Sequence, residues 1–169
     1  MPVDSFKFLP RLIRLFYKAN EVAPEFPIPW TALEKPLSAC TVGLITTGGL
    51  YLKDQQPPFD IERERVEPEW GDPSFREIPA SVRPEDIGVS HLHVNPAAVE
   101  QDFNILLPLA PVKELVAAGE VGALAEHHYS FMGYQGYPPN SKAWRTTYAP
   151  QVAASFLSQG VDCVLLTPS

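Results

Sequence analysis

The 169-residue sequence has few features of secreted, membrane or nucleic-acid-binding proteins. Its only two cysteines, Cys40 and Cys163, lie in apolar segments, which argues against a disulfide scaffold and favours a reducing compartment. No apolar run approaches the ~20 residues of a membrane span, and the start MPVDSFKF lacks a signal-peptide layout. Lysine and arginine total 13 against 20 acidic residues, a net charge of −7. We therefore expect a cytoplasmic protein without membrane or nucleic-acid partners.

Proline, in contrast, is abundant, with 19 residues that cluster between the apolar segments. This pattern indicates ordered loops around one core, and 45% apolar residues suffice for a single domain over residues 1–169. Within it we expect an N-terminal amphipathic helix (1–20), a proline-rich connector (21–39) and an α/β core (40–169). Leu12, Leu15 and Phe16 form the apolar stripe of that helix, which predicts docking on its own domain or on a second copy, so a homo-oligomer is expected.

Apolar, β-branched runs alternate with amphipathic segments along the core. Strands are predicted at 40–46, 75–78, within 84–94, at 127–133 and at 161–167, and helices at 111–124 and 142–159. The runs at 40–46 and 161–167 are almost continuously apolar, as in strands covered on both faces. The alternation predicts an α/β fold, a three-layer αβα sandwich with a mostly parallel, Rossmann-like sheet.

Ligands in such sheets bind beyond the carboxyl ends of the strands, and several polar segments are expected there. His91 and His93 would point to one face of a strand. The candidate catalytic residues are His91, His93, His127 and His128. The candidate substrate-binding residues are Thr46, Thr47, Gly48, Gly49, Asp102, Asn104, Tyr129, Ser130 and Ser169.

Three kinds of chemistry fit these histidines. One is a metal site of His91, His93, Asp102 and one of His127 or His128, although an HxH pair alone is weak evidence and no metal is assigned. The second is general acid–base catalysis by a histidine that Asp102 orients. The third is structural hydrogen bonding. Cys40 and Cys163 are expected to pack as small apolar residues rather than to act as nucleophiles.

Six segments, taken in order, resemble the B subunit of the glycine, sarcosine, betaine and D-proline reductases. They are VGLITTGGLYLKDQQPPFD, GDPSFREIP, QDFNILLPL, VKELVAAGEVGAL, HHYSFMGY and GVDCVLLTPS. The resemblance runs from about residue 30 to the end. It implies a redox enzyme subunit that cleaves a small substrate reductively by means of a selenol or thiol, with a thioredoxin-type thiol reductant. It also implies a partner reductase subunit, in some members one that bears a pyruvoyl group.

In that family a selenocysteine or cysteine directly follows the segment that resembles GVDCVLLTPS, so the nucleophile is expected just after Ser169. Because the selenocysteine codon otherwise means stop, we expect that this chain was cut off there and is inactive by itself, with no covalently bound cofactor of its own. The loop between Tyr51 and Pro73 is short and acidic, and the family's second half is absent, which leaves the substrate open. A histidine- or metal-dependent hydrolase or lyase and a non-catalytic binding subunit are the alternatives.

Overall fold

The computed structural model describes residues 9–19 and 31–169, and the chain divides into two compact units, residues 1–32 and 33–169. The described part of the first unit contains helix α1 (Arg11–Ala19). Leu12 and Leu15 are exposed on it, with Arg11 and Lys18 close by in the sequence. The remainder of the predicted helix 1–20 and most of the connector 21–39 lie outside the described residues. No helix in the described ranges is long and apolar enough to cross a membrane.

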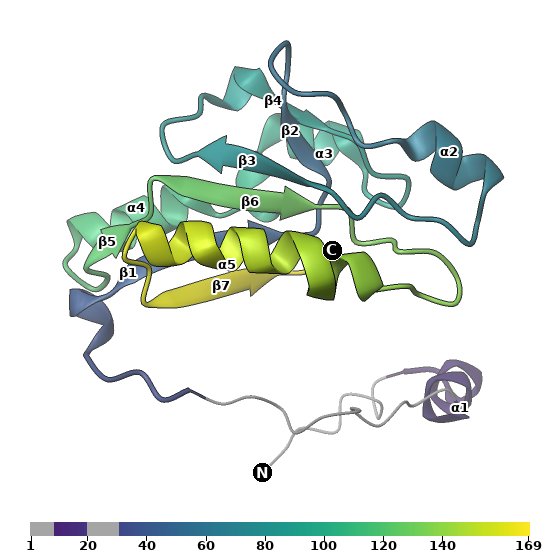
Figure 1. Ribbon diagram of the computed structural model, residues 1–169, viewed down its shortest axis with the longest axis horizontal. Coiled ribbons are helices and arrows are strands. Elements are labelled where there is room, and N and C mark those ends of the chain that lie inside the picture. Colours follow the sequence, from purple (N-terminus) through teal and green to yellow (C-terminus); the bar gives the residue numbers. More distant parts are fainter. Residues whose placement is uncertain (1–8, 20–30) are drawn as a thin grey trace. The chain divides into compact units, whose positions relative to one another are not determined.

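The second unit is an α/β structure in which short strands alternate with helices (Figure 1). Its strands are β1 (Thr41–Thr46), β2 (Leu50–Leu52), β3 (Phe75–Pro79), β4 (Ile87–Val89), β5 (Ala123–Leu124), β6 (His127–Phe131) and β7 (Cys163–Thr167). Its α-helices are α2 (Ile61–Val66), α3 (Pro96–Gln101), α4 (Leu109–Ala117) and α5 (Ala149–Ser158), and a π-helical turn, Trp144–Tyr148, leads into α5.

Strand β1 is the centre of the main sheet. All five residues of β7 pair in parallel with Val42–Thr46 of β1. On the other side of β1, β5 pairs in parallel with its first residues and β6 with Ile45 and Thr46. Strand β3 is antiparallel to β6, whereas β2 and β4 form a separate two-stranded antiparallel ribbon. The sheet is therefore mixed but mostly parallel, and the carboxyl ends of β1, β6 and β7 lie together.

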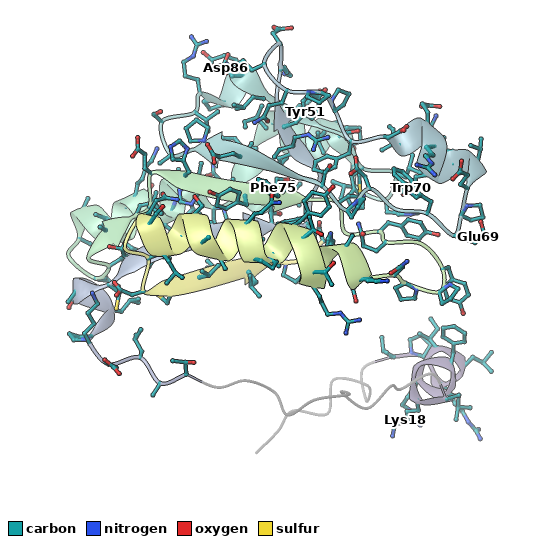
Figure 2. All side chains as sticks on the ribbon, in the orientation of Figure 1. Lys18, Tyr51, Glu69, Trp70, Phe75 and Asp86 are labelled. Carbon is teal, nitrogen blue, oxygen red and sulfur yellow. The ribbon has the colours of Figure 1, made fainter. Side chains whose placement is uncertain are left out.

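Helices cover the two faces of this sheet. In Figure 1 helix α5 lies in front of the sheet and α3 and α4 lie behind it. The α5 side is packed with aromatic residues, and Phe75, labelled in Figure 2, contacts Tyr129 edge-on with ring centroids 5.3 Å apart. Gly43 of β1 leaves room for Phe156 of α5, since a Cβ at Gly43 would lie 2.6 Å from its ring. The α4 side holds the aliphatic core, which includes Leu44, Ile78, Leu107 and Val112.

Local signals explain where the helices begin and end. Helix α5 has a proline in its first turn, directly after the π-helical turn Trp144–Tyr148. Gly119 and Gly160 have φ values of +74° and +68° just after α4 and α5, a conformation that glycine adopts without strain and that stops a helix. Asp60 caps α2 by accepting a hydrogen bond from the Arg63 amide at 3.0 Å.

The structure confirms the predicted α/β class and the mostly parallel sheet. It does not confirm the three-layer, Rossmann-like arrangement, because β3 is antiparallel and the β2–β4 ribbon forms a sheet of its own. The prediction of a fully buried last strand is wrong. In the described part of the chain β7 pairs with β1 alone, and Val164, Leu165 and Leu166 are 39%, 43% and 64% exposed.

Candidate functional site

The carboxyl edge of the sheet is built where β1, β6 and β7 end. The Thr47 amide donates to the carbonyl of Thr167 at 3.3 Å, and the Ser169 amide donates to Thr47 Oγ1 at 2.9 Å. The backbone after β7 thus continues alongside the end of β1. Gly133, two residues after β6, completes the edge, because a Cβ there would lie 2.8 Å from the Ser169 carbonyl oxygen. Ser169 therefore lies between the ends of β1 and β6.

Gly48 and Gly49 turn the chain from β1 into β2 within this edge. Gly49 has φ +67°, and a Cβ on it would lie 2.3 Å from the Ser90 carbonyl oxygen. Both glycine amides already donate hydrogen bonds, that of Gly48 to Thr46 Oγ1 at 3.1 Å and that of Gly49 to the Phe131 carbonyl at 2.9 Å. The two glycines thus allow the backbone segments to pack closely. Their amides are already used in hydrogen bonds within the fold and are not available to bind an anion.

An apolar cavity of about 400 Å³ adjoins the carboxyl edge on the α5 side. Thr47 and Thr167 border it at the sheet, and Trp144, which precedes α5, borders it on the helix side. The indole Nε1 of Trp144 is buried and has no hydrogen-bond partner in the described part of the chain. The remaining lining residues are Ile45, Phe131, Ala149, Leu166 and Pro168. A small, mainly apolar molecule would fit this space beside Ser169.

The predicted pair of histidines lies at the same edge, although on a turn instead of a strand. Strand β4 ends at Val89, and His91 and His93 follow in the turn before α3. The His93 amide donates to Nδ1 of His91 at 3.1 Å. His91 packs against the turn after β1, its Cβ lying 3.3 Å from where a Cβ on Gly49 would be.

Burial lowers the pKa of His91, and the neighbouring His93 adds to this effect. A neutral imidazole that accepts at Nδ1 carries its proton on Nε2. The Nε2 atom of His91 is buried and makes no hydrogen bond with any residue that the structure describes. His91 therefore presents a buried N–H donor at the edge.

Glu64 is a site residue that the sequence did not indicate. It lies on α2, its side chain is only 2% exposed, and neither carboxylate oxygen has a hydrogen-bond partner among the described residues. His93 Nε2 lies 4.0 Å from Glu64 Oε1. Burial raises the pKa of the Glu64 carboxyl, while His93 lowers it and Asp72 raises it. Segment 53–72 reads as an irregular acidic excursion, so only the Asp60 cap in the sequence could have revealed a helix there.

Two of the predicted catalytic histidines lie away from this edge. His127 begins β6, at the opposite end of the strand, with Nδ1 3.1 Å from Glu77 Oε1. His128 is fully buried, and its Nδ1 accepts a hydrogen bond from the Leu44 amide at 3.1 Å. Burial lowers its pKa to about 4. The structure therefore places His91 and His93 together at the carboxyl edge, whereas His127 and His128 lie at the amino end of β6.

The other predicted polar residues are bonded within the fold. Ser130 Oγ accepts from the Leu50 amide at 2.7 Å, and Thr46 Oγ1 donates to the Thr167 carbonyl at 3.2 Å. The Tyr129 hydroxyl donates to Ser155 Oγ on the α5 side. Asp102 caps a 3-10 turn by accepting from the backbone and side-chain nitrogens of Asn104, at 2.9 and 2.8 Å.

The proposed metal ligands do not converge. His91 and His93 lie at the carboxyl edge, His127 and His128 at the far end of β6, and Asp102 in its cap. Across residues 9–19 and 31–169, no group of three or more His, Cys, Asp or Glu side chains is placed to hold a metal ion. Cys40 is buried and Cys163 partly buried, and burial chiefly raises the pKa of the Cys163 thiol. A raised thiol pKa disfavours the nucleophilic thiolate.

Comparison with known proteins gives a consistent set of relatives. Residues 16–169 match the family described as glycine/sarcosine/betaine reductase selenoprotein B. The D-proline reductase subunit gamma of Acetoanaerobium sticklandii is 33% identical over 141 residues, which cover 83% of this chain and 53% of that protein. The betaine reductase complex component B subunit beta of Peptoclostridium acidaminophilum is 27% identical over 156 residues, 88% of this chain and 33% of that protein.

A third relative is the glycine reductase complex component B subunit gamma of Carboxydothermus hydrogenoformans. It is 27% identical over 140 residues, which cover 83% of this chain and 30% of that protein. The chain thus spans about half the length of the D-proline reductase subunit and about a third of the other two. No solved structure matches the chain.

Proposed function

The chain belongs to the glycine/sarcosine/betaine reductase selenoprotein B family, and on that premise we propose that it is the substrate-binding part of a reductive-cleavage enzyme. In the proposed reaction a dithiol supplies two electrons and two protons, and a carbon–nitrogen bond of the substrate breaks. The carbon and the nitrogen each take up one proton, and the dithiol leaves as a disulfide. A thiol reductant of the thioredoxin type and a partner reductase subunit, in the pyruvoyl-dependent case, complete the proposed system.

The observation that carries this proposal is the position of Ser169. Its amide is held by Thr47 at the end of the central strand, its carbonyl abuts Gly133, and its neighbours Thr167 and Pro168 line the apolar cavity. We propose that the full protein continues with a selenocysteine or cysteine after Ser169. That side chain would enter the carboxyl edge between β1 and β6, where a small substrate in the cavity lies within reach.

The nucleotide sequence after codon 169 gives the first test. The proposal expects an in-frame selenocysteine or cysteine codon followed by a coding region similar to the relatives. If no such frame follows, the proposed nucleophile is refuted.

The second test is an assay of the continued protein, that is, the chain extended beyond Ser169 by the reading frame described above. This protein is combined with its partner subunit and dithiothreitol, and amine release or ring opening is measured with D-proline, glycine, sarcosine and betaine. We expect turnover of at least one substrate, loss of turnover when the residue after Ser169 is changed to Ala, and no turnover by residues 1–169 alone. Ligand binding without turnover would instead identify a non-catalytic subunit.

A further inference from the structure

Glu64 is buried in an unusual way for a carboxylate on a short surface helix. Residues on either side of it are exposed, Arg63 stacking 4.3 Å over the Trp70 ring that Figure 2 labels beside α2. The Glu64 carboxylate is buried, and within residues 9–19 and 31–169 neither of its oxygens accepts a hydrogen bond. Native proteins rarely leave buried polar atoms unpaired, and such groups concentrate where they serve a function. The packing of α2 alone does not account for this carboxylate.

His93 is the ionisable group that faces Glu64 most closely. Its Nε2 lies 4.0 Å from Glu64 Oε1, while 65% of its side chain is exposed. The other charged group that acts on Glu64 is Asp72, whose Oδ1 accepts hydrogen bonds from the amide and the hydroxyl of Ser74. Arg76 lies 3.8 Å from the other Asp72 oxygen, so Asp72 is engaged elsewhere. Glu64 and His93 therefore form a pair with one buried and one accessible member.

The pair is connected to the edge where Ser169 lies. The His93 ring contacts that of Tyr134, with centroids 5.9 Å apart, and Tyr134 directly follows Gly133, which abuts Ser169. On its other side the His93 amide is held by His91, which packs against Gly49 after β1. His93 thus lies next to residues that follow the ends of β1 and β6.

We propose that Glu64 and His93 form a carboxylate–histidine dyad that delivers a proton to the nitrogen of the substrate. This role rests on the proposed function. His93 is the catalytic member, donating its proton to the nitrogen as the carbon–nitrogen bond breaks and regaining it from solvent. Glu64 is a positioning residue, whose buried carboxylate lies 4.0 Å from Nε2 and attracts the protonated ring. Glu64 thus has the orienting role that was predicted from the sequence for Asp102. The Asp102 carboxylate instead caps the 3-10 turn that follows it.

The kinetic test uses the continued protein in the reductase assay. His93→Gln should lower kcat by about 100-fold, the usual scale of a lost general acid. Glu64→Gln should lower kcat by about tenfold, because the ring of His93 loses the carboxylate that positions it. Glu64→Asp should restore part of the rate. Glu62→Gln, on the exposed side of α2 where Glu62 pairs with Arg65 at 3.0 Å, is the matched control and should leave kcat unchanged.

A second measurement needs no turnover and uses the 169-residue chain. Carbon-13 NMR of labelled glutamates should show one carboxyl, lost in Glu64→Gln, that titrates above the others. His93→Gln should move that titration to still higher pH. If it does not move, the dyad is refuted even where the reductase is active. If it moves but no substrate is turned over, the pair exists and the proposed function fails. An unchanged kcat for Glu64→Gln in an active enzyme would also overturn the proposal.

Discussion

The backbone amide of Leu44 donates its hydrogen bond to Nδ1 of His128, 3.1 Å away, inside the aliphatic half of the core. His128 is thereby a structural residue that joins β1 to β6. Its neutral form is required, because Nδ1 accepts and the ring is fully buried. The bond gives His128 the structural role that was one of the three alternatives for the histidines of this chain.

We therefore predict that the protein loses stability in mild acid through His128. Its pKa is about 4 in the folded state and about 6.5 when unfolded, so the unfolded chain binds more protons between these values. The stabilisation is fully present above pH 6.5 and is lost as the pH falls towards 4, to a total of about 3 kcal/mol. Urea denaturation at pH 7 and pH 4.5 measures this loss. His128→Asn, which keeps an acceptor but does not titrate, should show a smaller pH dependence, and an equal one would contradict the assignment.

Gly49 and Gly119 offer a matched pair of substitutions. Both have a positive φ, but a Cβ at Gly49 would lie 2.3 Å from the Ser90 carbonyl oxygen, whereas nothing lies within 4 Å at Gly119. Gly119→Ala should cost about 1 kcal/mol of unfolding free energy, from the backbone conformation alone. Gly49→Ala should cost clearly more, since the backbone must shift as well. Equal losses in thermal and chemical denaturation would show that the turn after β1 is loosely packed.

Thr47→Val should release the end of the chain without unfolding the core. The substitution keeps the size of the side chain but removes the oxygen that accepts the hydrogen bond of the Ser169 amide. A hydrogen bond of this kind contributes about 1 kcal/mol, so exchange of the Ser169 amide should accelerate roughly fivefold at the same pH. Thr146→Val, which removes a hydroxyl on the exposed turn before α5, is the control and should leave this amide unchanged.

The exposed strand β7 should make the 169-residue chain associate with itself. Leu165 and Leu166 are 43% and 64% exposed, and β7 has an outer edge that pairs with no other described strand. Such edges promote pairing between chains, and a lysine blocks it. Leu166→Lys should therefore reduce the apparent mass in analytical ultracentrifugation while barely changing stability. Leu157→Lys, at an exposed position of α5, tests whether any added charge has the same effect.

Much of the fold could be predicted because its signals are local. The apolar run of β1, the glycines after α4 and α5, and the alternation of strands and helices all depend on neighbouring residues. The exposure of β7 could not be predicted, because it depends on what pairs with its outer edge. The run of apolar residues is the same for a central strand and for an edge strand.

For the site, the sequence predicted the location, at the carboxyl edge of the sheet, better than it predicted which residues lie there. Thr47, Gly48, Gly49, His91, His93 and Ser169 all lie there. His127 and His128 do not, because parallel β6 carries them at its amino end, which the sequence could not orient. Glu64 could not be predicted as a site residue, because the sequence of an acidic segment does not show which of its carboxylates is buried. Only the structure shows that Glu64 is buried and faces His93 in the turn after β4.

The space that Gly43 leaves for the Phe156 ring also affects the apolar cavity beside the carboxyl edge. Phe156 belongs to the continuous helical stretch that begins at Trp144, and both Trp144 and Ala149 of this stretch line the cavity. A side chain at Gly43 would push this helix outward and reshape a pocket with which it shares no atom. Under the proposed function, a residue in the middle of the sheet would therefore influence the substrate selectivity of this chain, and directed evolution limited to pocket-lining positions would miss it.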